Sequence, residues 1–307
     1  MKVCNFLFHR VSPSSEAWST AISPGRLRSI LQLIKRIYRV CSLEEAYDQA
    51  SCGSMPLATL TFDDGFREDI EYAAPILESL KLTACFFLVV DSVESGRPNW
   101  SYELPRLFHL SVRRRLQIDC EHPGVLRGNF NFASSDALVA FGRTLISNLS
   151  QVPHTTASDI YQQIRMQLDD VAPSSTRMLS WSEARQLTGR GFEIGSHTYT
   201  HPFLSKVGDD AELAFELGES RQKFGQELGS PPQTIAYPFG DYDQRVAEAA
   251  KTSGYRLGFR VGQVFADSSS KERWCEPRVD LYADSSWLVT VLRILGYLEP
   301  LKRVLRR

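Results

Sequence analysis

The sequence predicts an α/β fold, a single barrel of alternating strands and helices with a largely helical insertion at about residues 95–176. Two observations carry this prediction. Short apolar, β-rich runs alternate with helical patterns along most of the chain. Several of these runs end abruptly in polar residues, as barrel strands do at their carboxyl-terminal ends. The 307 residues are compatible with one such barrel, because α/β barrels of this length form single domains.

The first part of the chain reads as strand, helix, short helix and strand. Residues 2–8 form an apolar strand that ends at His9. Residues 23–40 carry apolar side chains at helical spacing, with Ser23 as N-cap and Pro24 at the first helical position. Ser42 and Glu45 form a capping-box pattern that predicts a second, short helix. Residues 57–62, 68–80 and 83–90 then predict a strand, a helix and a strand, which together form a βαβ unit.

The alternation is lost in the insertion, where residues 135–149 give the clearest helix and Arg113–Arg115 are expected to form a solvated basic surface. It returns at Ser180 and Glu183, another capping box ahead of a helix that ends near Gly189. The remaining elements follow in order: strand 192–195, helix 209–228, strand 234–237, helix 243–253 and strand 256–260.

Composition and charge describe an ordinary folded chain. The net charge of −1 lacks the basic excess that nucleic-acid-binding proteins usually show, so we expect no nucleic-acid partner. The six cysteines show no CxxC spacing, which indicates reduced thiols. The first apolar run is too short for a signal peptide, and no apolar run reaches the length of a membrane span. The expected location is therefore cytoplasmic.

The segment Ser196–His201 places two histidines, His197 and His201, four residues apart. If this segment opens a helical turn, both imidazoles reach the same point, as metal ligands do. The candidates for a third ligand are the carboxylates Asp63 and Asp64, which follow the strand 57–62. Two His and one Asp would leave positions open for water and substrate, which favours a catalytic site over a structural one. The pattern predicts a metal-dependent hydrolase.

Three motifs occur in a characteristic order: TFDDG at 61–65, SHTYTH at 196–201 and YPFG at 237–240. Together with LSWSEARQLTGRGFEIGSH at 179–197, they resemble the polysaccharide deacetylase family, which shares the NodB homology domain and forms carbohydrate esterase family 4. The resemblance covers residues 57–90 and 179–261, and it implies a distorted (β/α)7-type barrel.

The resemblance also implies roles for individual residues. Asp64, His197 and His201 would bind one divalent metal ion, and Asp63 would act as the general base. Zinc is the first expectation for the ion, while manganese, iron, cobalt and nickel stay open. The turn of Tyr237, Pro238, Phe239 and Gly240 would contact the substrate, and the backbone N–H of Phe239 would stabilise the oxyanion.

The chain departs from the family pattern in two places. The arginine that usually precedes the third motif's proline-containing turn is absent, and Ala236 and Tyr237 stand there instead. Arg278 is our candidate to orient Asp63, the alternative being an ordinary surface ion pair. No histidine follows His201, although amide hydrolysis needs an acid for the leaving amine.

His9 is the candidate for that acid. The element Phe8-His9-Arg10-Val11 resembles the N-terminal histidine element of biofilm-polysaccharide deacetylases. The alternative is a capping histidine or one at the edge of the core.

We therefore expect a metal-dependent hydrolase that removes N-acetyl groups from an amino sugar in a polysaccharide, oligosaccharide or sugar precursor and releases acetate. The alternatives are an O-acetyl esterase or other amide hydrolase, and an inactive carbohydrate-binding homologue. The basic, apolar segment 287–307 is either a final barrel helix or a peripheral contact with the inner face of an anionic membrane. The sequence leaves the oligomeric state open.

Overall fold

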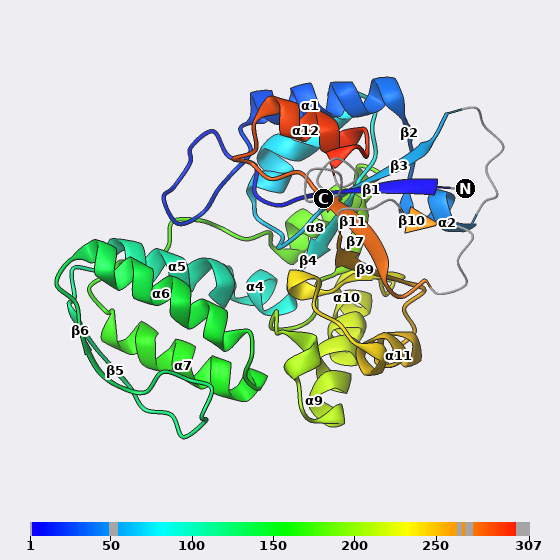
Figure 1. Cartoon of the computed structure of the whole chain (residues 1–307). Coiled ribbons are helices and arrows are strands. Elements are labelled where there is room, and N and C mark those ends of the chain that lie inside the picture. Colours follow the sequence, from blue (N-terminus) through cyan, green and yellow to red (C-terminus); the bar gives the residue numbers. More distant parts are fainter. Residues whose placement is uncertain (1, 49–54, 263–265, 268–272, 299–307) are drawn as a thin grey trace, which may run out of the picture.

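A closed barrel of seven parallel strands forms the centre of the molecule (Figure 1). The computed structural model describes residues 2–48, 55–262, 266–267 and 273–298. The barrel closes because β1 pairs in parallel with β3 on one side and with β11 on the other. Around the barrel the strands are β1 (Lys2–Phe8), β3 (Leu57–Phe62), β4 (Cys85–Leu88), β7 (Glu193–Ser196), β8 (Thr234–Ala236), β9 (Leu257–Val261) and β11 (Glu276–Asp280). The predicted α/β barrel is confirmed.

Two short strands extend this sheet. The first, β2 (Arg39–Val40), pairs in parallel with the start of β3. The second, β10 (Ala266–Asp267), pairs antiparallel with the start of β1. The helix predicted over 23–40 therefore ends early. In the structure α1 (Pro24–Ile37) stops before Tyr38, whose backbone is already extended, because the following residues pair with β3.

Side chains alternate along β1 and β3 between the outside and the inside of the barrel. Phe6, Phe8 and Phe62 point outward into the main hydrophobic core, where they pack with residues of α1 and α3 (Ala74–Ser79). The alternate positions of the two strands include the polar residues Asn5, Thr59 and Thr61, and Thr59 donates a hydrogen bond to Asn5 at 2.7 Å. The barrel interior thus contains a hydrogen-bonded polar column directly below the residues that follow β3.

The helices on the outside differ from the predicted ones mainly at their ends. The strand expected over 83–90 ends at Leu88, and α4 (Val90–Ser95) begins two residues later. The helix expected over 68–80 begins as a π-helix, η1 (Asp69–Ala73), before continuing as α3. The other helices around the barrel are α2 (Leu43–Asp48), α8 (Trp181–Gly189), α11 (Gln244–Thr252) and the short turns η2 (Leu204–Lys206) and η4 (Pro238–Gly240).

The helix predicted over 209–228 is also interrupted. It consists of α9 (Asp210–Ala214), a π-helical stretch η3 (Phe215–Glu219) and α10 (Ser220–Leu228). A π-helical turn inserts an extra residue and so changes which side chains face the barrel, and such turns occur frequently at functional sites.

The insertion packs beside the barrel around a hydrophobic core of its own (Figure 1). Its helices are α5 (Trp100–Leu110), α6 (Ser135–Leu149) and α7 (His154–Gln167). It also contains an antiparallel pair that the sequence analysis did not predict, β5 (Arg115–Ile118) and β6 (Gly128–Asn131). Arg113 lies on the surface as expected, where it pairs with Asp169.

The chain's last described helix, α12 (Trp287–Ile294), follows β11 and lies beside α1 (Figure 1). It is shorter than the segment 287–307 singled out in the sequence, because Gly296 adopts a positive φ of 73° just after the helix. Residues 299–307 lie outside the described part of the chain. Among the described helices, none combines the length and apolar character needed to cross a membrane.

Candidate active site

Polar groups from several strands meet at the carboxyl-terminal end of the barrel. Asp63 and Asp64 follow β3, His197 follows β7, and η4 follows β8. Arg278 lies within β11. These strand ends share one face of a barrel, which is where barrel enzymes place their catalytic groups.

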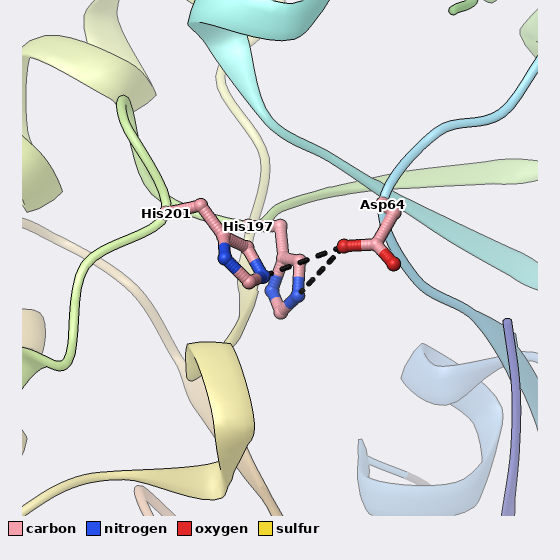
Figure 2. A group of neighbouring side chains, drawn as sticks. All are labelled: Asp64, His197 and His201. Atoms are coloured by element: carbon pink, nitrogen blue, oxygen red, sulfur yellow. Dashed lines mark ion pairs between the residues drawn. The ribbon is translucent and has the colours of Figure 1, made fainter. Parts of the chain in front are cut away.

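Three of the predicted ligands come together at this face. Figure 2 shows both imidazoles directed at the same carboxylate oxygen of Asp64. The Nε2 atoms of His201 and His197 lie 3.4 and 3.9 Å from Asp64 Oδ1. One ligand atom from each residue falls within 4.8 Å of the others, which is the spacing of a divalent-ion site.

The chemical state of these groups suits a metal. The Ala236 carbonyl oxygen lies 2.7 Å from His197 Nδ1 and can only accept, so Nδ1 carries the proton and Nε2 keeps its lone pair for a ligand. Burial lowers the pKa of His197 to about 4, which keeps the ring neutral near neutral pH. Burial would raise the pKa of Asp64, but the hydrogen bond and charge of His201 outweigh it and the pKa is lowered. The donor set therefore fits a divalent ion.

The histidine segment does not form the helical turn predicted for it. Thr198 and His201 both have positive φ, 68° and 64°, and the segment is an irregular loop. The hydroxyl of Thr198 accepts the His201 N–H at 3.1 Å, which fixes the turn. The imidazoles still converge, with ring centroids 4.8 Å apart, because the loop folds back on itself.

Glu216 holds this loop in place and was not identified from the sequence. It lies in η3 and is only 2% exposed. Its Oε2 accepts the N–H groups of Tyr199 at 2.9 Å and Thr200 at 3.0 Å, while its Oε1 accepts the Thr200 hydroxyl at 2.5 Å. Its carboxylate thus supports two of the three residues that connect His197 to His201.

Asp63 is bound on both oxygens by a fully buried arginine. Arg278 Nη1 and Nη2 each lie 2.6 Å from one Asp63 oxygen, and the side chain of Arg278 is 0% exposed. Asp63 Oδ2 is also 3.7 Å from His197 Nε2. Burial would raise the pKa of Asp63, but Arg278 and His197 outweigh it, so the pKa is lowered and the carboxylate is ionised.

Backbone strain is concentrated at the site. Among the described non-glycine residues, five have positive φ, and four of them are Asp64, Thr198, His201 and Phe239. Such conformations cost about 1–3 kcal/mol each and persist where the surrounding structure enforces them. Their clustering marks this end of the barrel as functional.

In the turn predicted to bind substrate, Tyr237 and Phe239 have different environments. Tyr237 is buried in a hydrophobic cluster and donates its hydroxyl to the Trp274 carbonyl. Phe239 is 41% exposed, and its ring lies edge-on to His201 at 4.8 Å and stacks on Phe203 at 3.9 Å. Gly240 is required because a Cβ there would lie 2.5 Å from the backbone nitrogen of Val261. Phe239 therefore forms one wall of the site.

The insertion contributes two contacts that the sequence analysis missed. Asn99 Nδ2 donates to Asp64 Oδ1 at 3.1 Å, and Trp100 Nε1 donates to the His201 carbonyl at 3.0 Å. The sequence signal at Asn99 is that of an N-cap, and its side chain does cap α5. The start of α5 thus contacts the side chain of one candidate ligand, Asp64, and the backbone of another, His201.

His9 lies exposed just after β1 and makes no side-chain hydrogen bond in the described part of the chain. Its charge acts to lower the pKa values of Asp63, Asp64 and Asp280. Asp280, at the end of β11, is nearly buried, and this burial raises its pKa. His9 is therefore near the site, and its role as an acid stays a prediction, as do the roles of Arg278 and of the Phe239 N–H.

Comparison with solved structures supports the fold. The chain aligns with the Streptococcus pyogenes deacetylase PplD, solved in complex with acetate, at a TM-score of 0.63 and 16% identity over 96% of this chain and 98% of that one. It aligns with IcaB from Ammonifex degensii at a TM-score of 0.61 and 17% identity, covering 96% and 97%. At these identities the likeness concerns the fold alone.

Sequence comparison gives the family. Chitin deacetylase 1 of Cryptococcus neoformans var. grubii is 36% identical over 64 residues, which is 21% of this chain and 13% of that protein. The aligned part is thus a small share of that relative's length. The profile of the polysaccharide deacetylase family matches residues 50–258, more than half of the chain. The chain belongs to the polysaccharide deacetylase family.

Proposed function

We propose that the protein is a metal-dependent hydrolase that removes N-acetyl groups from an amino sugar of a polysaccharide, oligosaccharide or sugar precursor and releases acetate. Asp64, His197 and His201 would hold one divalent ion, with zinc as the first candidate. When bound, such an ion polarises the acyl oxygen and makes water a better nucleophile at neutral pH.

The observation that carries the proposal is the pairing of two neighbouring carboxylates with different partners. Asp64 faces the two imidazoles, whereas Asp63 is bound on both oxygens by Arg278 and lies 3.7 Å from His197. Asp63 is thereby kept ionised and oriented at the edge of the ligand set, as a general base must be. This arrangement of Asp63 and Asp64 favours a hydrolytic site over a purely structural metal site.

The remaining residues have proposed roles around the acetyl group. His9 would donate a proton to the leaving amine. The Phe239 N–H would stabilise the oxyanion, a contribution worth about 3 kcal/mol for one well-placed donor. The ring of Phe239, beside Phe203, would pack against a sugar face.

Acetate release tests this function. Wild-type protein loaded with zinc is expected to release acetate from N-acetylglucosamine oligosaccharides. The Asp63→Asn variant should keep the metal, and its kcat should fall about 10²–10⁴-fold. Metal content measured on both proteins separates loss of the base from loss of the ion.

Two other outcomes identify the alternatives. Release from O-acetylated but not N-acetylated sugars would make the protein an esterase. Sugar binding without acetate release from polymer, lipid-linked or nucleotide-linked substrates would indicate an inactive binding homologue.

A further inference from the structure

The outward face of α12 is apolar, which is unusual for a helix on the surface of a barrel. Trp287, Leu288 and Leu295 are exposed, and Val291 and Leu292 between them are partly exposed. These five positions recur at helical spacing and form one stripe, which we call the α12 stripe. A surface helix ordinarily presents polar side chains there.

The opposite face of α12 is already fully engaged. Thr290 and Ile294 are buried, the Thr290 hydroxyl accepts a hydrogen bond from Arg26, and the Ile294 carbonyl accepts one from Tyr38. Arg26 belongs to α1, and Tyr38 follows its last residue. The buried face of α12 therefore fixes this helix to α1. The apolar stripe is therefore an outer surface and not the packing face of the helix.

Exposed apolar side chains are concentrated in this segment. Twelve large hydrophobic residues in the described chain are markedly exposed, and five of them lie between residues 282 and 297. These five are Tyr282, Trp287, Leu288, Leu295 and Tyr297. Three are Tyr or Trp, whose rings combine an apolar body with a polar group and favour the interface between lipid and water.

Charge distinguishes between possible occupants of this surface. From Trp287 to the last residue the sequence contains five basic residues and one acidic residue, although the whole chain has a net charge of −1. A second copy would bring two such basic segments together, which like charges oppose. An anionic bilayer attracts the same charges, by about fivefold in affinity for each basic residue near its surface.

We propose that the α12 stripe, with Tyr282 and Tyr297 at its ends, binds the surface of an anionic lipid bilayer. The apolar side chains enter the headgroup region, and the basic charge of the segment 287–307 adds attraction to anionic lipids. This binding is independent of the proposed deacetylation, because no residue of the stripe belongs to the metal centre.

Vesicle sedimentation tests the inference with the full chain. We expect wild-type protein to pellet with vesicles of phosphatidylcholine and phosphatidylglycerol and much less with phosphatidylcholine alone. Leu288→Glu should weaken binding at least ~10-fold, since it places a charge at a 67% exposed apolar position. Met166→Glu is the matched control, because Met166 is 71% exposed on α7, outside the stripe, and should bind as wild type does.

A second variant tests the electrostatic part. Replacing Lys302, Arg303, Arg306 and Arg307 by Gln should remove the preference for anionic lipid. The inference is overturned if wild type fails to pellet, if neutral and anionic vesicles bind equally, or if Met166→Glu weakens binding as much as Leu288→Glu. It is also overturned if wild type is a dimer in solution that Leu288→Glu converts to a monomer, which would assign the stripe to a second copy.

Discussion

Two adjacent carboxylates, Asp63 and Asp64, differ because their partners come from different parts of the chain. Asp64 faces His197 and His201, and Asp63 faces Arg278. Asp63 is buried and Asp64 is only partly exposed, so each carboxylate depends on its partners to remain ionised. One sequence motif thus supplies a candidate ligand and a candidate base.

Replacing Arg278 is expected to destabilise the protein strongly. Arg278→Met leaves Asp63 buried without its bidentate partner, and the loss of one member of a buried pair costs about 3–5 kcal/mol. The free energy of unfolding from urea denaturation measures this cost. Arg190→Met removes a comparable pair with Glu78 on the surface and should cost less than about 1 kcal/mol. Equal effects of the two substitutions would contradict the structural role of Arg278.

Asp69 gives a prediction about pH. It is fully buried, neither carboxylate oxygen has a hydrogen-bond partner among the described residues, and burial raises its pKa well above the usual value. Above about pH 4 the unfolded carboxyl loses its proton while the folded one keeps it, so stability falls by up to about 1.4 kcal/mol per pH unit until the folded pKa is passed. Asp69→Asn should remove this slope, and urea denaturation at several pH values measures it. An identical pH dependence in both proteins would show that Asp69 does not contribute.

At the scale of elements, both π-helical stretches carry a buried acid near the site. Asp69 begins η1 shortly after the Asp63–Asp64 motif, and Glu216 lies in η3 behind the histidine loop. Successive side chains of an α-helix are rotated by roughly 100° about its axis. One extra residue in a π-helical stretch therefore changes the direction in which a nearby side chain such as Glu216 points. The irregular helices are therefore part of the site's construction.

Metal affinity tests the role of η3. Glu216→Ala removes the acceptor for two backbone N–H groups and one hydroxyl of the histidine loop, and we expect zinc to bind about 10–100-fold more weakly. Competition with a chelator measures this change. Glu219→Ala, at an exposed position of the same stretch, is the control and should leave affinity unchanged. Unaltered affinity in Glu216→Ala would remove Glu216 from the metal centre.

For the whole molecule, the sequence predicts the barrel, and it singles out three candidate ligands that the fold brings together, for a physical reason. Parallel strands deliver the residues that follow them to one face, so Asp64 and His197 can be assigned to one site from strand order alone. The prediction of a helical turn at Ser196–His201 is wrong. The positive φ values of Thr198 and His201 depend on contacts of the loop with Glu216 and on the loop's own hydrogen bonds. No local pattern contains that information.

Contacts between segments that are distant in the sequence are likewise not encoded in a local sequence pattern. Asn99 reads as an ordinary N-cap, yet it also bonds Asp64, and that contact exists only because the insertion folds against the barrel. Arg278 was proposed from a missing arginine in the family pattern, and its position within β11 brings it to Asp63.

The most direct test of the central claim is a metal titration of acetate release. Metal-free protein should release no acetate from N-acetylglucosamine oligosaccharides, and activity should rise with added zinc to a plateau at one equivalent per chain. His201→Ala, which lacks one of the three donors of the site, should stay inactive at that equivalence. Full activity of the metal-free protein, or a plateau unaffected by His201→Ala, would contradict a metal-dependent deacetylase built on Asp64, His197 and His201.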